Sequence, residues 1–430
     1  MLILIKEGRF VDPGCNIDEI ADVYIKDDRI LFIKKPEEKV EISEHEIDRI
    51  INAKSMVVTA GLIDMHVHFR EPGYEHKETI ETGCLAAIKG GFTAVCTMPN
   101  TNPVNDCRQV TEYIIKKAQS IGLNRIYPVG AVTIGSKGEK LCIYSQLKKA
   151  GAVALSDDGS PVSNSLVMKE ALKLAKVYKL PIISHSEDLS IVGSGVMNYG
   201  FVSKRLGLSG IPNAAESAMV MRDLDLCEQT GSHLHIAHLS TKESVDAIRN
   251  AKKRGVKVTA ETAPHYFTLT DEAVEKFSTN AKVNPPLRSE KDRDGIREGL
   301  VDETIDVIAC DHAPHLQVEK NTAFDLAPNG IIGLETSLAL GLKLVREKII
   351  SLNSLIKKMH TNPAHILKME HELKPGALAD ITIIDTEKEF SIKASEVCSK
   401  SINTPFDGWK FTGKAVCTIV GGKIVYWDEY

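Results

Sequence analysis

The sequence predicts a (β/α)8 barrel, the TIM barrel architecture, together with a small β domain that both chain ends build. Three observations lead to this prediction. The chain has 430 residues, a length that suits a large barrel plus a minor domain. Its middle alternates apolar runs of strand length with periodic segments of helix length. Its two ends instead contain short β-rich runs that are separated by turn signals.

The two chain ends resemble each other and differ from the middle. Turn signals such as Asp12-Pro13-Gly14 and Gly421-Gly422 interrupt runs that are rich in β-forming residues. The predicted strands are 2–6, 22–26, 30–33, 379–384, 415–420 and 423–426. We therefore predict one composite β-sandwich domain, formed by residues 1–57 and 373–430.

Residues 58–372 are predicted to form the barrel. Helical periodicity is clearest at 166–178 and 242–253, and each of these segments follows an apolar run. The predicted barrel strands are 61–69, 94–98, 126–132, 152–156, 181–185, 233–239, 257–261 and 306–310. Eight such strand–helix units are the number that closes a parallel barrel.

Composition narrows the classes of function. A net charge of −5 provides no electrostatic footprint for nucleic acid. No stretch approaches the roughly 20 uninterrupted apolar residues of a transmembrane helix, so no membrane association is expected. The nine cysteines are scattered and form no Cys-x-x-Cys pair, which indicates a reducing, cytoplasmic location rather than a disulfide framework.

The strongest single motif is the run from Asp64 to Arg70, which lies at the end of the first predicted barrel strand. Residues two apart on a strand face the same way, so His66 and His68 can converge on one ion. Imidazole nitrogen is a favoured ligand of zinc and related metals. A lone His-x-His is often a pair of structural histidines, and other strand ends must supply matching ligands to change that interpretation.

Four other predicted strands do end in metal-capable residues, and barrel active sites form where strands end. Each motif alone is weak, because Asp-Asp-Gly is usually a turn and a lone histidine is usually structural. These strand ends are Ser156–Gly159, Ser184–Glu187, His233–His238 and Cys310–His315. Together they predict two metal ions that share a carboxylate, an arrangement that activates water and polarises a carbonyl. Asp311 is the natural candidate to move a proton to a leaving nitrogen.

Several motifs together resemble the type I dihydroorotases of bacteria and archaea, within the amidohydrolase superfamily. The two signature segments are 64–73 and 309–320, and further matches lie at 98–101, 283–288, 327–336 and 375–382. The resemblance therefore covers nearly the whole chain. It implies a metal-dependent barrel hydrolase that acts on a cyclic amide.

The resemblance also implies residue roles. His66, His68 and Asp311 would bind the first zinc ion, His185 and His238 would bind the second, and Asp158 would bridge the two. The implied substrate contacts are Arg70, Asn100 and His315 around a carboxylate, with His68 beside them, and Asn284, Asn329 and Gly330 around the ring. His233 and His235 match no ligand position and are interpreted as structural.

The implied reaction is the reversible hydrolysis of (S)-dihydroorotate to N-carbamoyl-L-aspartate, a step of pyrimidine (UMP) biosynthesis. By this hypothesis a hydroxide between the two metals attacks the ring amide, and Asp311 shuttles the proton. A homodimer and an association with aspartate transcarbamoylase are further expectations from the resemblance.

Three alternatives stay open at this point. Many relatives bridge the metals with a carboxylated lysine, but the next lysine here is Lys169. Asp158 fits the subgroup that uses aspartate, although strand parity does not separate it from Asp157. The other functional hypotheses are a hydantoinase, dihydropyrimidinase or allantoinase of the same superfamily, and a non-catalytic scaffold for aspartate transcarbamoylase.

Overall fold

A parallel eight-stranded barrel dominates the computed structural model, which describes residues 1–38, 42–369 and 372–428. The strand order follows the chain, and every neighbouring pair is parallel. The barrel strands are β6 (Leu62–Val67), β7 (Phe92–Thr97), β8 (Arg125–Gly130), β9 (Ala154–Ser156), β10 (Ile182–Ser184), β13 (Leu234–Ile236), β14 (Val258–Thr262) and β15 (Val307–Ile308). Each of the eight predicted strands overlaps one of these, so the predicted barrel is confirmed.

Contacts between the first and last strands nearly close the ring. Val67 forms a parallel bridge with His312, and the His68 amide donates to the His312 carbonyl at 2.9 Å. The buried Asp64 carboxylate links the same two segments, because it accepts from the amides of His66 (2.9 Å) and Cys310 (3.0 Å). Burial raises the pKa of Asp64 to about 6. The first and last strand ends are thus held side by side.

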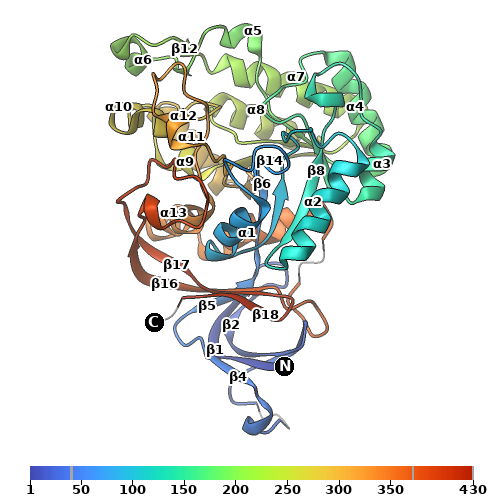
Figure 1. Ribbon diagram of the computed structural model, residues 1–430, viewed down its shortest axis with the longest axis vertical. Helices are drawn as coiled ribbons and strands as arrows, with labels where there is room; N and C mark the ends of the chain where they lie inside the picture. Colours follow the sequence, from blue (N-terminus) through green and yellow to red (C-terminus); the bar gives the residue numbers. More distant parts are fainter. Residues whose placement is uncertain (39–41, 370–371, 429–430) are drawn as a thin grey trace.

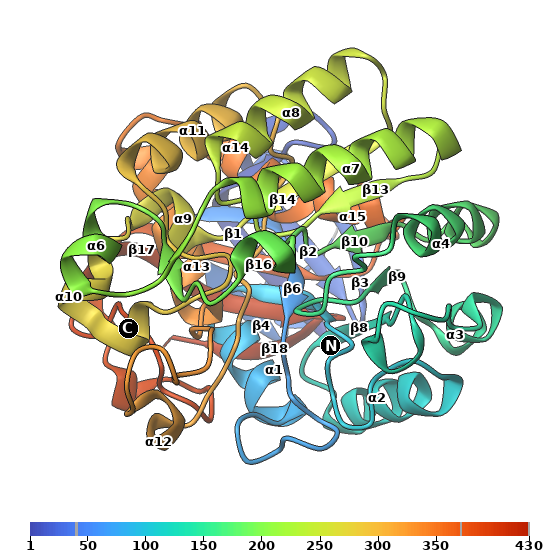
Figure 2. The same cartoon turned by 90° about the horizontal axis from the view of Figure 1, so that it is seen from above.

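Helices surround the barrel, as the view from above shows (Figure 2). In α8 the buried residues Val245, Ile248 and Ala251 recur at helical spacing and form one apolar face. Asn164 caps the start of α4 through its side chain, as Thr241 does for α8. The surrounding helices are α1 (Ile80–Lys89), α2 (Arg108–Ile121), α3 (Tyr144–Ala150), α4 (Ser165–Tyr178), α7 (Ala214–Thr230), α8 (Lys242–Lys253), α11 (Glu290–Val301) and α13 (Leu334–Arg346). The predicted helices 166–178 and 242–253 correspond to α4 and α8.

Short elements extend the loops at the carboxyl ends of the strands, which face upward in Figure 1. They follow β10, β14 and β15. They are α5 (Leu189–Val192), β11 (Met197–Asn198), α6 (Phe201–Leu206), β12 (Gly210–Ile211), α9 (Pro264–Thr268), α10 (Ala273–Phe277) and α12 (Gln317–Lys320). Two further helices, α14 (Leu352–Ile356) and α15 (Asn362–Leu367), follow α13.

The two chain ends form one mixed sheet beneath the barrel (Figure 1). Its order is β18-β17-β16-β5-β1-β2-β3, with β4 paired to β1. The strands are β1 (Leu2–Asp12), β2 (Ile17–Lys26), β3 (Arg29–Lys34), β4 (Arg49–Asn52), β5 (Val57–Ala60), β16 (Ile381–Ser391), β17 (Lys410–Val420) and β18 (Lys423–Trp427). The side chains of this sheet form an apolar core of their own, which includes Ile5, Phe10 and Ile383.

The predicted terminal strands are confirmed, but β4 and β5 were not anticipated. β5 pairs with β1 and β16, and it crosses the predicted boundary between residues 57 and 58. The exact domain limits stay a prediction. The terminal sheet covers the amino ends of the barrel strands, where Thr382 donates to the carbonyl of Gly91 at 2.6 Å. The carboxyl ends are left free to form a site.

Candidate metal centre and substrate cavity

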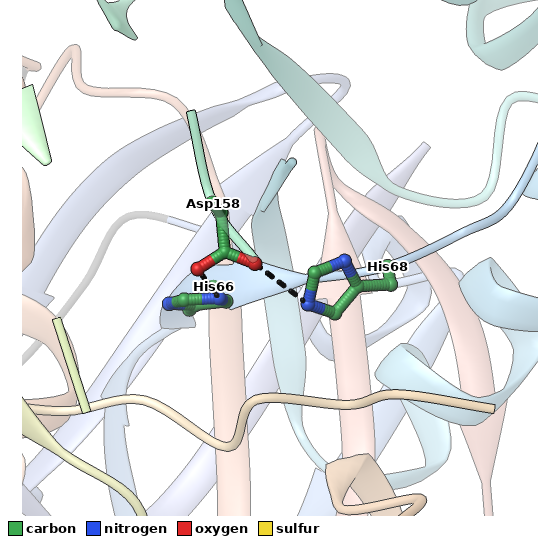
Figure 3. Close-up of side chains that lie close together, drawn as sticks. All are labelled: His66, His68 and Asp158. Atoms are coloured by element: carbon green, nitrogen blue, oxygen red, sulfur yellow. Dashed lines mark ion pairs between the residues drawn. The ribbon is translucent and has the colours of Figure 1, made fainter. Parts of the chain in front are cut away.

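Six metal-capable side chains meet at the carboxyl ends of five barrel strands. His66 lies within β6 and His68 directly after it, while the others follow β9, β10, β13 and β15. Figure 3 shows the Asp158 carboxylate between the imidazoles of His66 and His68. The full set comprises His66, His68, Asp158, His185, His238 and Asp311, and all six are buried. The structure thus brings together every metal ligand that the sequence predicted.

Asp158 is the centre of this cluster. Its Oδ1 lies 3.4 Å from His66 Nε2, 3.5 Å from His185 Nδ1 and 3.4 Å from His238 Nε2. Its Oδ2 lies 3.4 Å from His68 Nε2. One carboxylate therefore faces four histidines, three near Oδ1 and His68 near Oδ2. The geometry is that of a bridging ligand.

The four distances from Asp158 fit metal coordination, whereas His185 Nδ1 and His238 Nε2 lie 2.8 Å apart, at a hydrogen-bond distance. Two ligand atoms at zinc–nitrogen and zinc–oxygen bond lengths are roughly 3.3–3.5 Å apart in a tetrahedral site. Among the described residues, His66 Nε2 and Asp158 Oδ1 are buried without a hydrogen-bond partner. Buried polar atoms rarely lack partners, so these two are suited to an ion. The described residues contain two compatible groups, His66–His68–Asp158 and Asp158–His185–His238.

The pKa values of the cluster reflect its mixture of charges. Burial opposes the charged form of Asp158, but His66 outweighs burial and holds the pKa of that carboxyl well below its usual value. Burial likewise opposes protonation of His66, yet Asp158 and Glu261 raise its pKa well above the usual value. The four histidine rings face a carboxylate that stays ionised. A cation between them would be stabilised by the same charge.

Asp311 lies beside the first group. Its Oδ1 is 3.1 Å from His68 Nε2 and 3.6 Å from His66 Nε2. Its backbone φ is +48°, a left-handed conformation that is uncommon for aspartate. The carboxylate lines the cavity described below. It is placed to contact both an ion and a bound molecule.

Partners behind the histidines determine which ring nitrogen faces the cluster. Glu261 Oε1 is 2.6 Å from His66 Nδ1, and Glu187 Oε2 is 3.3 Å from His185 Nε2. Asn100 Oδ1 is 2.8 Å from His68 Nδ1. Partners of this kind fix the tautomer and orientation of metal-binding histidines.

Sequence reasoning missed the roles of Glu187 and Glu261, although both had a signal. Glu187 follows His185 by two residues. Glu261 is a charged residue at the end of the predicted barrel strand 257–261, to which no site residue had been assigned. Asn100 was assigned to the substrate; in the structure its side chain contacts His68 and also lines the cavity.

The structure separates Asp157 from Asp158. Asp157 Oδ1 accepts from the amides of Val132 (2.8 Å) and Thr133 (3.1 Å), and its Oδ2 accepts from the Thr133 hydroxyl. Its carboxylate is thus occupied by the neighbouring loop. Asp158 is the one that faces the histidines.

The remaining histidines of these motifs face elsewhere. His233 Nε2 and His235 Nδ1 lie 3.0 and 2.8 Å from the Thr259 hydroxyl. His312 Nε2 lies 3.2 Å from Glu78 Oε2. None of the three lines the cavity. Their placement agrees with structural roles.

A cavity of about 190 Å³ opens above the cluster. It is lined by predicted ligands and by every predicted substrate contact. Those contacts are His68, Arg70, Asn100, Asn284, His315, Asn329 and Gly330. The other lining residues are Asp158, Gly159, His185, His238, Asp311 and Ala313. The residues predicted from the sequence are therefore neighbours in space, and His66 is the one predicted site residue that does not line the cavity.

Arg70 provides positive charge in this cavity. Its Nε donates to the Pro314 carbonyl at 3.3 Å, and its Nη2 lies 3.3 Å from His315 Nε2. Among the described residues, no carboxylate forms an ion pair with this guanidinium. Burial, together with Arg70 and Lys77, lowers the pKa of His315 to about 2, so its ring is neutral. The guanidinium remains free to bind an anionic group.

Comparisons with known proteins agree with this geometry. A family model described as Dihydro-orotase-like matches residues 55–244. A protein named Dihydroorotase from Desulforapulum autotrophicum is 53% identical over 429 residues and covers 100% of both chains. Another of that name, from Geobacter metallireducens, is 53% identical over 427 residues, with 99% of this chain and 100% of the relative covered.

Solved structures give the same fold. The L-hydantoinase (dihydropyrimidinase) from Arthrobacter aurescens has a TM-score of 0.88 at 25% identity and covers 100% of this chain and 96% of its own. The dihydropyrimidinase from Brevibacillus agri has a TM-score of 0.84 at 20% identity, with 100% and 95% covered. The relatives of high identity extend over the full chain, and the chain belongs to the dihydroorotase family.

Proposed function

We propose that this chain is a zinc-dependent dihydroorotase, which hydrolyses (S)-dihydroorotate reversibly to N-carbamoyl-L-aspartate. The observation that carries the proposal is the Arg70 guanidinium, which lies beside the histidine–aspartate cluster and forms no ion pair with a carboxylate of the described residues. Dihydroorotate has a carboxylate on its ring, which an arginine binds through strong charge-assisted hydrogen bonds. Full-length relatives named Dihydroorotase support the same assignment.

Two zinc ions are part of the proposal. His66, His68 and Asp311 would hold one ion, His185 and His238 the other, and Asp158 both. When bound, such ions supply a Lewis acid for the ring carbonyl and a nucleophile near neutral pH. Nitrogen and carboxylate ligands suit zinc, as they suit cobalt and manganese to a lesser extent.

Asp311 is proposed as the proton shuttle. Its carboxylate lines the cavity and lies 3.1 Å from His68 Nε2, between the cluster and the place of the ring. During ring opening the amide C–N bond breaks and a C–O bond to the attacking oxygen forms. Asp311 takes the proton from that oxygen and delivers it to the departing nitrogen. Ring closure runs through the same transfers in reverse.

The other cavity residues orient the substrate. Arg70, His315 and Asn100 would bind its carboxylate, and Asn284 would contact the ring together with the Asn329–Gly330 backbone. Asn284 is itself oriented by Glu187, whose Oε2 accepts from its side-chain amide at 3.1 Å. Such positioning of the ring against Asp311 lowers the entropic part of the barrier.

A substrate panel tests the proposal. Purified protein with zinc should open dihydroorotate and close N-carbamoyl-L-aspartate, with little turnover of dihydrouracil, hydantoin or allantoin. Replacing Arg70 with Met should lower kcat/KM for dihydroorotate by about a hundredfold, because a charge-assisted contact to the substrate is lost. Turnover of the uncharged rings alone would favour the hydantoinase hypothesis, which the fold of the Arthrobacter enzyme also permits.

Further properties concern the location and the partners of the chain. Within the described residues, none of the helices has the length and hydrophobicity needed to span a bilayer. All nine cysteines are unpaired, which supports a reducing cytoplasmic location. A homodimer and an association with aspartate transcarbamoylase stay predictions from the family resemblance.

A further inference from the structure

A buried amide from the C-terminal part of the chain reaches the wall of the substrate cavity. Asn403 is 0% exposed. Its Nδ2 donates to the carbonyls of Ala313 (3.1 Å) and Gly330 (3.0 Å), and its Oδ1 accepts from the His315 amide at 3.0 Å. Both amide hydrogens and the carbonyl oxygen are therefore engaged. One side chain joins two loops that are each more than seventy residues away in sequence.

A buried lysine holds the same loop from another direction. Lys320, also 0% exposed, donates to the carbonyls of Gly330 (2.9 Å), Pro328 (2.9 Å) and Lys282 (3.3 Å). Three carbonyl acceptors match the three hydrogens of an ammonium group. The Gly330 carbonyl thus receives two side-chain donors, Lys320 and Asn403.

The loop that these donors hold has little freedom of its own. Gly330 has a φ of +129°, and a Cβ built there would lie 2.6 Å from the Ala313 Cβ. Its amide donates to the Lys282 carbonyl at 2.9 Å. A small displacement of Gly330 would therefore move Ala313 and the adjacent His315 as well.

Neither Lys320 nor Asn403 lines the cavity, but their partners Ala313, His315 and Gly330 do. These partners lie on the side of Arg70, whose guanidinium is 3.3 Å from His315. We propose that Asn403 and Lys320 are positioning residues, which set the spacing between the two loops that bind dihydroorotate. This inference rests on the proposed function and adds the residues that keep its substrate-binding wall in place.

Replacing Asn403 with Asp gives the sharpest test. The variant keeps an acceptor for the His315 amide but places an oxygen against two backbone carbonyls. We expect KM for dihydroorotate to rise about tenfold, with kcat within about threefold of wild type, because substrate binding is lost without a change in the chemical groups. Zinc content, measured by elemental analysis, should stay at the wild-type level.

Asn124→Asp is the matched control. Asn124 is also a buried asparagine, and its Nδ2 donates to the Phe92 carbonyl at 2.7 Å, at the opposite end of the barrel. This variant should lower the melting temperature without raising KM. Lys320→Met is the second test variant, and it should raise KM in the same way.

The double variant Asn403→Asp/Lys320→Met adds a coupling test. Because both side chains converge on the Gly330 carbonyl, the combined rise in KM should be smaller than the product of the single effects. Independent effects, or rises in KM no larger than that of Asn124→Asp, would overturn the inference. A wild-type enzyme without dihydroorotate turnover would instead overturn the proposed function, so the two failures are distinguishable. If Asn403→Asp does not fold, Lys320→Met against Asn124→Asp decides the question.

Discussion

The two ends of the barrel contain the same kinds of buried polar side chain, but they differ in how those side chains are hydrogen-bonded. At the amino end, His360 Nδ1 lies 2.8 Å from the Gly61 carbonyl, and Lys358 donates to the Ile305 carbonyl at 2.6 Å. At the carboxyl end, His66 Nε2 and Asp158 Oδ1 are buried 3.4 Å apart and have no hydrogen-bond partner among the described residues. The two amino-end side chains bind backbone carbonyls of the chain, whereas the two carboxyl-end atoms face other metal-capable side chains.

This difference teaches which buried polar residues carry function. A buried polar atom without a partner costs free energy, so a fold retains one only where something else compensates. Atoms without a hydrogen-bond partner occur at both ends, Asn124 Oδ1 among them, but within the described residues His66 and Asp158 at the carboxyl end belong to groups that could hold a metal ion. Polar groups of the amino end should therefore affect stability, and those of the carboxyl end chemistry. Substitutions at the two ends should separate these contributions, and the following predictions run from the largest expected effect to the smallest.

Asp158→Asn should have the largest effect. Loss of the bridging charge removes a shared ligand of both proposed ions, and we expect activity to fall about a thousandfold, or ~4 kcal/mol. Metal content should fall in elemental analysis. Asp157→Asn is the control: its carboxylate binds the 132–133 loop, so the variant should keep its metal and lose only stability. Equal metal loss in the two variants would contradict the separation of Asp157 from Asp158.

Glu261→Gln should weaken metal binding without removing a ligand. Glu261 faces His66 Nδ1 at 2.6 Å, and loss of such a partner typically lowers metal affinity about 10–100-fold. Competition with a chromophoric chelator would measure this affinity. Glu335→Gln, which removes a carboxylate paired with Lys89 away from the cluster, should leave the affinity unchanged. An unchanged affinity in Glu261→Gln would mean that His66 does not depend on this partner.

The eight barrel strands could be predicted from sequence, because the alternation of apolar strands and periodic helices is a local pattern. Strand-end polarity indicated the region of the site, and the resemblance to dihydroorotases supplied the choice of the six proposed ligands. The partners of those ligands could not be predicted. Glu261 and His66 are 195 residues apart, and Asn403 lies 90 residues from Ala313. No periodicity relates such pairs; only the closed barrel brings them together. The choice of Asp158 over Asp157 likewise required the contacts of the 132–133 loop.

Lys358→Met should leave metal binding and turnover unchanged, and its effect should appear in the pH dependence of stability. Burial lowers the pKa of Lys358 from 10.5 to about 8. Below pH 8 Lys358 is protonated in both the folded and the unfolded chain, and burial of its charge lowers the stability of the fold. Above pH 10.5 Lys358 is neutral in both states, and this cost disappears. Wild-type stability should therefore rise between pH 8 and 10.5, by on the order of 3 kcal/mol from this group. Lys358→Met should lack that contribution.

Denaturant unfolding at several pH values measures this difference. Lys357→Met is the control, because Lys357 is only partly buried and pairs with Glu303 at 2.7 Å. Its pH profile should follow that of wild type across the same window. A Lys358→Met profile that also rises like wild type would show that the amino end does not bury this charge.

The most direct test of the central claim is metal removal and restoration with dihydroorotate as substrate. The account predicts that chelator abolishes ring opening and that added zinc restores it. Asp311→Asn should stay without turnover even at a zinc concentration that restores its metal content, because its amide cannot accept the proton. Ring opening that persists in metal-free protein, or near-normal turnover by Asp311→Asn, would contradict the account.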